Sequence, residues 1–492
     1  RSRPNHRSRV LCGGTVVAGG SDGCAIFFPI ARLARTNDIS SLMEARKKRL
    51  GLPNPRQGAP PVWAAMFLST CRSLRIVAVP LFAQMCWLSC GPATSTDLDA
   101  GPCTGSACDQ CPAGRMTTIR GVVTAPNGID PVPGALVYVP AAELTAFPAG
   151  IRCEACQQLV GATKAVVSTA SDGSFVLGPV PFQGEPAHAS VVTQMGRFRS
   201  ARDIAIDVPC GENRPAAENF RLPGKNNGVA QTIPRIAVAQ GHYDSMECVL
   251  RGMGVEEFDL YEGNGLPSGT VGSFGSLLRD SQIMRSYNII FINCGNDYEY
   301  LLSLPGVRQN IESYVADGGR LYVTDWSYDY IEQIQSFAPV IDFEPGASDE
   351  LPEAMNDAEL GRGGIVVAAK VLSSPLVEWL KEVERVTGDA LIDAADRVEV
   401  KGLAGRWVQQ YRVLPADHVT VWLEGNADGL RPLTTTFDEN QCGRALFSSY
   451  HTVDGGAREG GFPGYCTDFQ LSPQERVLEY LIFHIASCIT VE

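Results

Sequence analysis

The stretch that decides the fold spans residues 287–329 and has the sequence YNIIFINCGNDYEYLLSLPGVRQNIESYVADGGRLYVTDWSYD. Residues 288–293 are an apolar run that ends in a polar turn, which predicts a buried β-strand. Residues 307–315 place Val, Ile, Tyr and Val at helical spacing behind a Pro-Gly pair, which predicts a helix.

A glycine pair and a second strand complete the unit. Gly318 and Gly319 are expected to end the helix, because glycine readily adopts the left-handed conformation found at helix ends. Residues 321–324 then form a second apolar run. Strand, helix and strand in this order predict a parallel sheet, in which ligands bind at the carboxyl ends of the strands. Residues 294–297 and 325–329 are therefore the expected places for chemistry.

The 492 residues allow two or three domains, and their charge is divided unevenly. Residues 1–75 carry 13 Lys and Arg against 3 Asp and Glu, whereas the remainder carries 28 against 51. A strongly acidic body disfavours nucleic acid as a partner.

Residues 1–65 show no sustained periodicity and are expected to be an unstructured or non-genuine extension. Residues 66–89 (MFLSTCRSLRIVAVPLFAQMCWLS) combine basic residues with an apolar stretch too short for a membrane span, which is typical of an export signal. Together with Cys90 they resemble a bacterial lipoprotein signal, which implies lipidation of Cys90 and, with Gly91 after it, sorting to the outer membrane. An ordinary cleaved signal or a buried helix is the alternative.

Cysteine is abundant, with 16 residues, and twelve of them lie at or after Cys90. Residues 90–115 are expected to be a small-residue tether that contains some of them. Two C-x-x-C pairs offer a tetrathiolate zinc site as one alternative. Behind an export signal, disulfides are favoured instead. The candidate cysteines of this N-terminal group are Cys103, Cys108, Cys111, Cys153, Cys156 and Cys210.

Residues 116–222 contain short alternating strands separated by turns, which predicts a small β-sandwich. The segments IRGVVTAPNGIDPVPGALVYV and TASDGSFVLGPV resemble a carboxypeptidase regulatory-like domain, a transthyretin-like sandwich. The resemblance implies an accessory module without catalytic residues. Residues 141–164, which hold one C-x-x-C pair, are an insertion relative to that pattern.

Residues 230–492 begin with a further strand and helix at 235–239 and 245–253. Neither a dinucleotide fingerprint nor a P-loop is present, and no cofactor is expected. The order of segments resembles a class I glutamine amidotransferase-like domain, which implies a flavodoxin-like α/β fold. Residues 346–440 interrupt this layout and are expected to be a β-rich insertion.

The resemblance places Asp325 where that family has its nucleophilic cysteine, and His451, in ALFSSYHT, at the position of the catalytic histidine. Val453 stands where the family's acidic residue would be. A carboxylate is a weak nucleophile toward an amide, so the sequence predicts that amidotransferase chemistry is lost.

Three catalytic alternatives remain open. In the first, Cys294 serves as a thiol nucleophile with His451, and in the second, Ser327 pairs with His451. The third is a divalent metal at the strand ends, held by Asp325, Asp329, His242, Asp244 and His451. His484 lies in an apolar run and is expected in the core.

In the C-terminal part, Cys442 and Cys466 flank a glycine-rich loop and are expected to close it with a disulfide. Residues 473–488 are expected to form a final helix.

Together these features resemble lipoproteins of myxobacteria and their relatives, and imply an exported, lipid-anchored protein of the cell envelope. The expected role is non-catalytic, in binding a protein or glycan ligand or in structure. The alternative is a hydrolase or transferase that uses His451 with Cys294, Ser327 or a metal.

Overall fold

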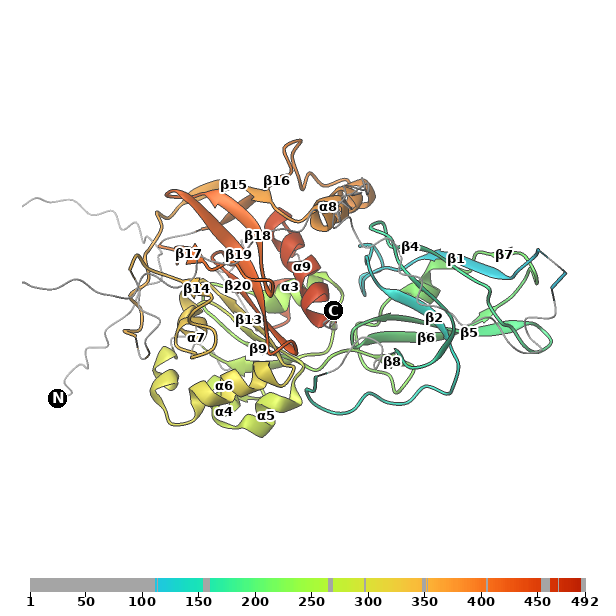
Figure 1. Cartoon of the computed structure of the whole chain (residues 1–492), viewed down its shortest axis with the longest axis horizontal. Helices are drawn as coiled ribbons and strands as arrows, with labels where there is room; N and C mark the ends of the chain where they lie inside the picture. Colours follow the sequence, from blue (N-terminus) through green and yellow to red (C-terminus); the bar gives the residue numbers. More distant parts are fainter. Residues whose placement is uncertain are drawn as a thin grey trace, which may run out of the picture. The chain divides into compact units, whose positions relative to one another are not determined.

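The computed structural model describes residues 111–487 except 113, 154–159, 264–268, 296–297, 347–350, 352, 404–405, 453–460 and 468. The proposed export signal, Cys90, Cys103, Cys108 and Cys156 therefore lie outside the described residues. The described part consists of an N-terminal β region and a larger region built on one mixed sheet, both belonging to one compact unit (Figure 1).

The N-terminal β region holds two sheets, with strand orders β4-β1-β7 and β3-β2-β5-β6-β8. Its elements are β1 (Thr118–Val122), β2 (Leu136–Pro140), β3 (Thr163–Ser168), β4 (Ser174–Leu177), β5 (His188–Met195), β6 (Phe198–Ala205), β7 (Glu212–Asn213), η1 (Ala217–Phe220) and β8 (Gln231–Thr232).

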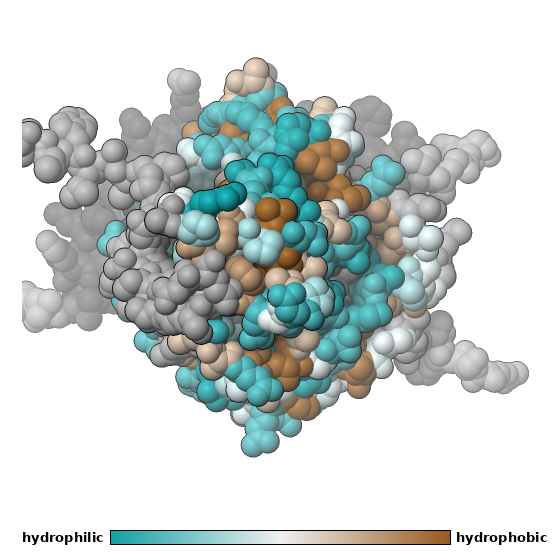
Figure 2. Space-filling view, turned by 90° about the vertical axis from the view of Figure 1, so that its right-hand side faces the viewer, coloured by the Kyte–Doolittle hydropathy of each residue, from teal (hydrophilic) through white to brown (hydrophobic). Residues whose placement is uncertain are grey.

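Apolar side chains from both of these sheets form the interior of the β region. Ile119, Val137 and Val191 are buried, and the rings of Phe175 and Phe220 meet edge to face at 4.9 Å. Gly121 is required here, because a Cβ at this position would lie 2.5 Å from the Phe220 ring. On the face shown in Figure 2, apolar residues occur in several small groups among hydrophilic ones.

The second region is built on a ten-stranded sheet with the order β11-β10-β9-β12-β13-β20-β19-β18-β15-β16. Its strands are β9 (Ile236–Ala239), β10 (Asp259–Glu262), β11 (Gly272–Ser273), β12 (Ile289–Ile292), β13 (Arg320–Thr324), β15 (Ile365–Val371), β16 (Arg397–Leu403), β18 (Val419–Asn426), β19 (Leu430–Glu439) and β20 (Gly443–Ser448). A separate pair joins β14 (Ile341–Asp342) and β17 (Arg412–Val413).

The helices of this region are α3 (Met246–Gly252), α4 (Phe274–Arg279), α5 (Ser281–Ser286), α6 (Val307–Ala316), α7 (Asp329–Glu332), α8 (Ser374–Thr387) and α9 (Pro473–Ala486). Short 3-10 turns are η2 (Glu299–Ser303), η3 (Asp325–Ser327) and η4 (Gly464–Cys466). The predicted strand at 288–293, helix at 307–315 and strand at 321–324 are confirmed as β12, α6 and β13.

The strands from β11 to β20 are parallel, and the sheet continues in antiparallel register through β19, β18, β15 and β16. In chain order, the five main parallel strands have the spatial order 2-1-3-4-5. After β9, the chain adds β10 on one side of it and then β12, β13 and β20 on the other side. Segment 346–440 supplies the antiparallel strands and extends the same sheet.

Helices cover both faces of the parallel strands, with α4, α5 and α6 on one face and α3 and α9 on the other (Figure 1). Neighbouring residues in each strand face opposite layers, as period-2 geometry requires. In β12, Phe291 joins the cluster that contains α3 and α9, whereas Ile290 and Ile292 join the cluster that contains α4 and α6. Burial on both faces explains why these strands are continuous apolar runs.

Direct contacts join the β region to the mixed-sheet region. Arg476 in α9 donates from Nη1 to Asp130 Oδ2 at 2.6 Å and to Glu479 Oε2 at 2.8 Å. Trp379 in α8 donates to Pro131 O at 2.7 Å. Burial and the nearby Asp130 raise the pKa of Glu479 to about 8, although Arg476 opposes this.

Three disulfides also connect distant segments: Cys111–Cys210, Cys153–Cys442 and Cys248–Cys466. The expected Cys442–Cys466 pairing is wrong. Cys442 precedes β20 at the amino edge of the sheet, whereas Cys466 packs beside α3 past the carboxyl end of β9. The strand between them therefore carries the chain from one edge of the sheet to the other.

Candidate functional site

The turns after β9, β12, β13 and β20 converge at the carboxyl edge of the parallel sheet. Because these strands are hydrogen-bonded neighbours, the residues that follow them meet. The resulting carboxyl-edge cluster consists of Asp244, Cys294, Thr324, Asp325, His451 and Thr452. Each member lies at or just beyond the end of one of these four strands.

Asp325 occupies a sharp turn between β13 and η3. Its φ is 43°, in the left-handed region, where Asp and Asn are tolerated better than most residues with a side chain. The side chain is 1% exposed, and its Oδ1 accepts a hydrogen bond from Val408 N at 2.7 Å. The sequence prediction that an aspartate stands at an elbow after this strand agrees with this geometry.

Burial, with a smaller contribution from the neighbouring Asp244, raises the pKa of Asp325 to about 7. His451, Val408 N and the Cys294 thiol act in the opposite direction. The carboxyl group thus sits near the midpoint of its titration at neutral pH, which is typical of groups that exchange a proton.

Asp244 is the central acceptor of the cluster. Its Oδ2 accepts from Thr324 Oγ1 at 2.6 Å, and its Oδ1 accepts from Ser245 N at 2.8 Å and Thr452 N at 3.1 Å. Ser245 N also donates to Thr452 Oγ1 at 2.9 Å. One buried carboxylate therefore joins the turns after β9 and β20 to the end of β13.

Cys294 is a reduced, buried thiol, 1% exposed. Its Sγ donates to Asp325 Oδ2 at 3.7 Å, and its backbone N donates to Thr324 Oγ1 at 2.9 Å. The thiol is thus a hydrogen-bond donor to the carboxyl group of the elbow.

His451 approaches the same carboxylate oxygen. Its Nε2 lies 4.0 Å from Asp325 Oδ2, and its Nδ1 is 3.0 Å from Thr452 O. The backbone carbonyl of His451 accepts from Gln474 Nε2 at 2.7 Å, and the residue as a whole is 8% exposed. His451 therefore lies beside the carboxyl group of the elbow, in a setting closed to solvent.

Ser327 is fully buried, and its Oγ donates to Asn293 O at 3.1 Å. Its hydroxyl proton is thus committed to a backbone carbonyl. This geometry does not favour Ser327 as a nucleophile activated by His451.

Of the expected metal set, Asp244, Asp325 and His451 belong to the carboxyl-edge cluster, whereas His242 and Asp329 do not. His242 is exposed, with its ring 5.1 Å from that of Tyr243. Asp329 is buried in α7, where burial and the neighbouring Glu299 raise its pKa to about 7. Among the residues that the structure describes, no group of three or more His, Cys, Asp and Glu side chains is placed to hold a metal ion.

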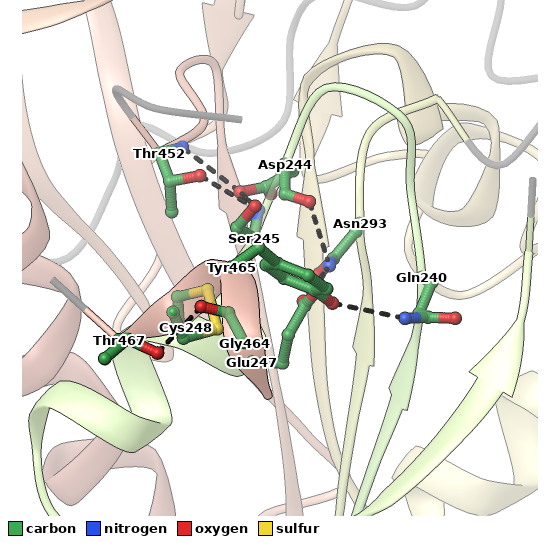
Figure 3. Close-up of a disulfide and its surroundings, with 11 residues drawn as sticks. Gln240, Asp244, Ser245, Glu247, Cys248, Asn293, Thr452, Gly464, Tyr465 and Thr467 are labelled. Atoms are coloured by element: carbon green, nitrogen blue, oxygen red, sulfur yellow. Dashed lines mark hydrogen bonds between the residues drawn. A yellow bond between two sulfur atoms is a disulfide. The ribbon is translucent and has the colours of Figure 1, made fainter. Parts of the chain in front are cut away.

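A second polar network lies beside the cluster and was not predicted from the sequence (Figure 3). Glu247 in α3 accepts from Asn293 Nδ2 at 3.0 Å and from Tyr465 OH at 2.7 Å, and Gln240 Nε2 donates to Tyr465 OH at 3.3 Å. The Cys248–Cys466 disulfide holds η4, and hence Tyr465, against α3. The sequence feature that could have indicated this network is Glu247, a glutamate on the buried side of the helix that follows Asp244.

His484, expected in the core, packs its ring on Trp422 at 4.7 Å and lies beside Arg444. Burial and the two nearby guanidinium groups lower its pKa to about 3, so it stays neutral. It takes no part in the carboxyl-edge cluster.

The comparisons with known proteins give no family assignment. No protein-family model matches the chain, and no curated protein matches it. A GH42 β-galactosidase structure is 11% identical over 54% of this chain and 31% of its own, with a TM-score of 0.25. An exo-β-1,4-mannosidase from Opitutaceae bacterium strain TAV5 is 11% identical over 53% of this chain and 37% of its own, with a TM-score of 0.24. The chain spans about a third of the length of these enzymes, and TM-scores this low carry no argument.

Proposed function

We propose that this chain is an exported cell-envelope protein with a non-catalytic role in binding or structure. In this proposal a transthyretin-like β-sandwich leads into a flavodoxin-like, class I glutamine amidotransferase-like domain that has lost its chemistry. The 2-1-3-4-5 order of the main parallel strands supports the flavodoxin-like part, since it is the order of that class of doubly wound sheet.

The observation that carries the proposal is the state of Asp325. The elbow position holds a carboxyl group that is buried, accepts from Val408 N and lies beside His451. Covalent attack on an amide needs a strong nucleophile that the substrate can reach. The carboxyl group of Asp325 is a weak nucleophile and is buried. Instead, the His451 imidazole and the Cys294 thiol both lie against the carboxyl group of Asp325.

Export is supported by the disulfides. Three bonds link segments 99, 289 and 218 residues apart, and such bonds persist in oxidising compartments. A lipid anchor at Cys90, placement at the outer membrane and the absence of nucleic acid as a partner remain parts of the proposal that rest on the sequence. Among the described residues, no helix is long and apolar enough to cross a membrane.

Thiol reactivity tests the non-catalytic role. We expect iodoacetamide to leave Cys294 unmodified in the native protein and to modify it after denaturation, as read by peptide mass spectrometry. Release of ammonia from glutamine should stay at background. Rapid native alkylation of Cys294 that is suppressed in His451→Gln would instead show an activated thiol and overturn the proposal.

The same measurement covers the second candidate function, a hydrolase or transferase that uses Cys294 and His451. The specific observation in its favour is that the Cys294 sulfur and the His451 Nε2 lie 3.7 and 4.0 Å from the same oxygen, Asp325 Oδ2. Closure of all three side chains to solvent weighs against it.

The lipid anchor has its own test. Metabolic labelling with palmitate should mark the wild-type protein and fail to mark Cys90→Ala. Equal labelling of the two proteins would contradict lipidation at this residue.

A further inference from the structure

Two adjoining cavities open at the amino edge of the parallel sheet, on the side opposite the carboxyl-edge cluster. The smaller has a volume of about 40 Å³ and the larger about 360 Å³. Both are lined by Arg197, Pro234 and Asn288, so they adjoin, and the two together are here called the amino-edge cleft.

The smaller cavity is lined by basic and neutral residues. Arg152, Arg197 and Arg320 are among the residues that line it, and no Asp or Glu occurs among the described residues of its lining. Two carboxylates nearby are engaged elsewhere, because Asp317 pairs with Arg285 and Asp259 pairs with Arg235. In a chain with a net charge of −13, a cavity of this composition is a local site of positive potential.

The three arginines differ in the hydrogen bonds that their guanidinium groups donate. Arg320 donates to Ile485 O at 2.7 Å, Cys442 O at 2.7 Å and Ser487 O at 3.2 Å, all neutral acceptors. Arg197 donates to Pro148 O at 2.8 Å. Arg152 is exposed, and no contact that fixes its side chain occurs among the described residues. A planar guanidinium with N–H groups to donate matches a carboxylate or phosphate.

The cleft is held in shape by bonds between the β region and the sheet. Asn288 Nδ2 donates to Gly150 O at 3.1 Å, Ile151 N donates to Arg285 O at 2.8 Å, and Cys153 is bonded to Cys442. Gly318 lets the backbone of Arg152 approach, because a Cβ there would collide with Arg152 O. A preformed site avoids the entropic cost of ordering its walls when a ligand binds.

The two volumes indicate how a ligand would divide between them. The smaller holds about the volume of a few waters or of one carboxylate or phosphate group. The larger is within the range of small-molecule sites and adds Phe147, Phe258 and Asn226 to its walls. Its lining carries the charged residues Arg235, Asp259 and Glu257 besides Arg197. Arg235 pairs with Asp259 at 3.1 Å, and Glu257 Oε2 accepts from Asn226 N at 2.8 Å.

We propose that the amino-edge cleft binds a small ligand that carries one carboxylate or phosphate on an uncharged polar body, such as an acidic sugar. The anionic group lies against Arg152, Arg197 and Arg320, and the body lies in the larger cavity. This deepens the proposed binding role by naming the ligand class. It also gives a role to residues 146–152, the part of the insertion that lines the two cavities.

Binding of defined probes to the full chain tests the proposal. Isothermal titration should show binding of inorganic phosphate and of glucuronate, and none of glucose. Arg152→Gln should weaken glucuronate binding about tenfold, the loss expected for one charge-assisted contact. The control is Arg251→Gln, an exposed arginine outside the cleft lining, which should leave the Kd unchanged.

Three outcomes would overturn the proposal: no anion binds, glucose binds as well as glucuronate, or the two arginine variants weaken binding equally. Circular dichroism of each variant verifies that it is folded. The result is independent of Cys294 alkylation, so failure of the cleft to bind and failure of the non-catalytic assignment are told apart.

Discussion

The two edges of the parallel sheet differ in how they use their polar groups. At the carboxyl edge, Asp244, Asp325 and His451 are buried and bonded to neighbours from four strand ends. At the amino edge, Arg152 and Arg197 line an open cleft, and none of the described residues around its smaller part is an Asp or Glu. The carboxyl edge is closed by its own polar contacts, whereas the amino edge is open and lined by arginines.

The difference shows that strand topology alone does not locate binding. Open parallel sheets usually bind ligands at their carboxyl edge because loops and strand ends diverge there. Here the chain fills that edge with its own carboxylates, hydroxyls and a thiol. The β region and its disulfide to Cys442 instead build walls at the other edge.

The largest expected effect is at Asp244. Asp244→Ala removes the acceptor for Thr324 Oγ1, Ser245 N and Thr452 N in a buried site, which should lower the free energy of unfolding by about 3–5 kcal/mol. Urea denaturation followed by circular dichroism measures it.

Asp244→Asn is the matched control, because its amide oxygen retains one acceptor and should cost about half as much. A loss below about 1 kcal/mol for Asp244→Ala would show that the carboxyl edge is not held together by its polar network.

Disulfide removal at the two edges is expected to separate stability from binding. Serine pairs in place of Cys248 and Cys466, or of Cys153 and Cys442, should each cost about 2–4 kcal/mol of unfolding free energy. Only the second pair should weaken glucuronate binding, because Cys153 adjoins Arg152 and Cys442 O accepts from Arg320. Equal weakening by both pairs would contradict the assignment of binding to the amino edge.

Asp325 predicts a pH dependence at the carboxyl edge. Its pKa is raised from 3.8 to about 7, so the folded state binds more protons than the unfolded state between these values. Its stabilising contribution is therefore full below about pH 4 and is lost as pH rises through 7. Asp325→Asn should abolish this loss, reducing the fall in unfolding free energy between pH 4 and 8 by roughly 2–3 kcal/mol.

Urea denaturation at a series of pH values measures this dependence, with Asp389→Asn on the exposed surface as the control. Parallel pH profiles for the wild type and Asp325→Asn would show that the elbow carboxyl is already ionised at neutral pH.

The elements predicted correctly from the sequence are those whose residues carry a local pattern of apolar positions. Continuous apolar runs flanked by turns predicted β9, β12 and β13, and helical spacing predicted α6 and α9. The missed strand β16 has the sequence RVEVKGL, in which buried Val398 and Val400 alternate with exposed Arg397 and Glu399, so the period-2 signal was present in the sequence.

The site was predicted only in part. Asp325 at the elbow and His451 nearby followed from segment order, and the structure places them 4.0 Å apart. The role of Asp244 could not be foreseen, since its bonds to Thr324 and Thr452 join residues 80 and 208 positions apart. The pairing of Cys442 failed for the same reason, because closeness in sequence does not predict the edge of the sheet on which a cysteine emerges.

The smallest expected effect on stability is at Arg152, where the two edges contrast most. Its side chain is exposed and lines the amino-edge cleft, so Arg152→Gln should change the free energy of unfolding by less than about 0.5 kcal/mol. The same variant should weaken glucuronate binding about tenfold. A residue that contributes to binding and not to stability is one whose polar groups the fold has not used. If Arg152→Gln destabilises the protein as Asp244→Ala does, polar side chains at both edges of the sheet stabilise the fold, and the contrast between the two edges is wrong.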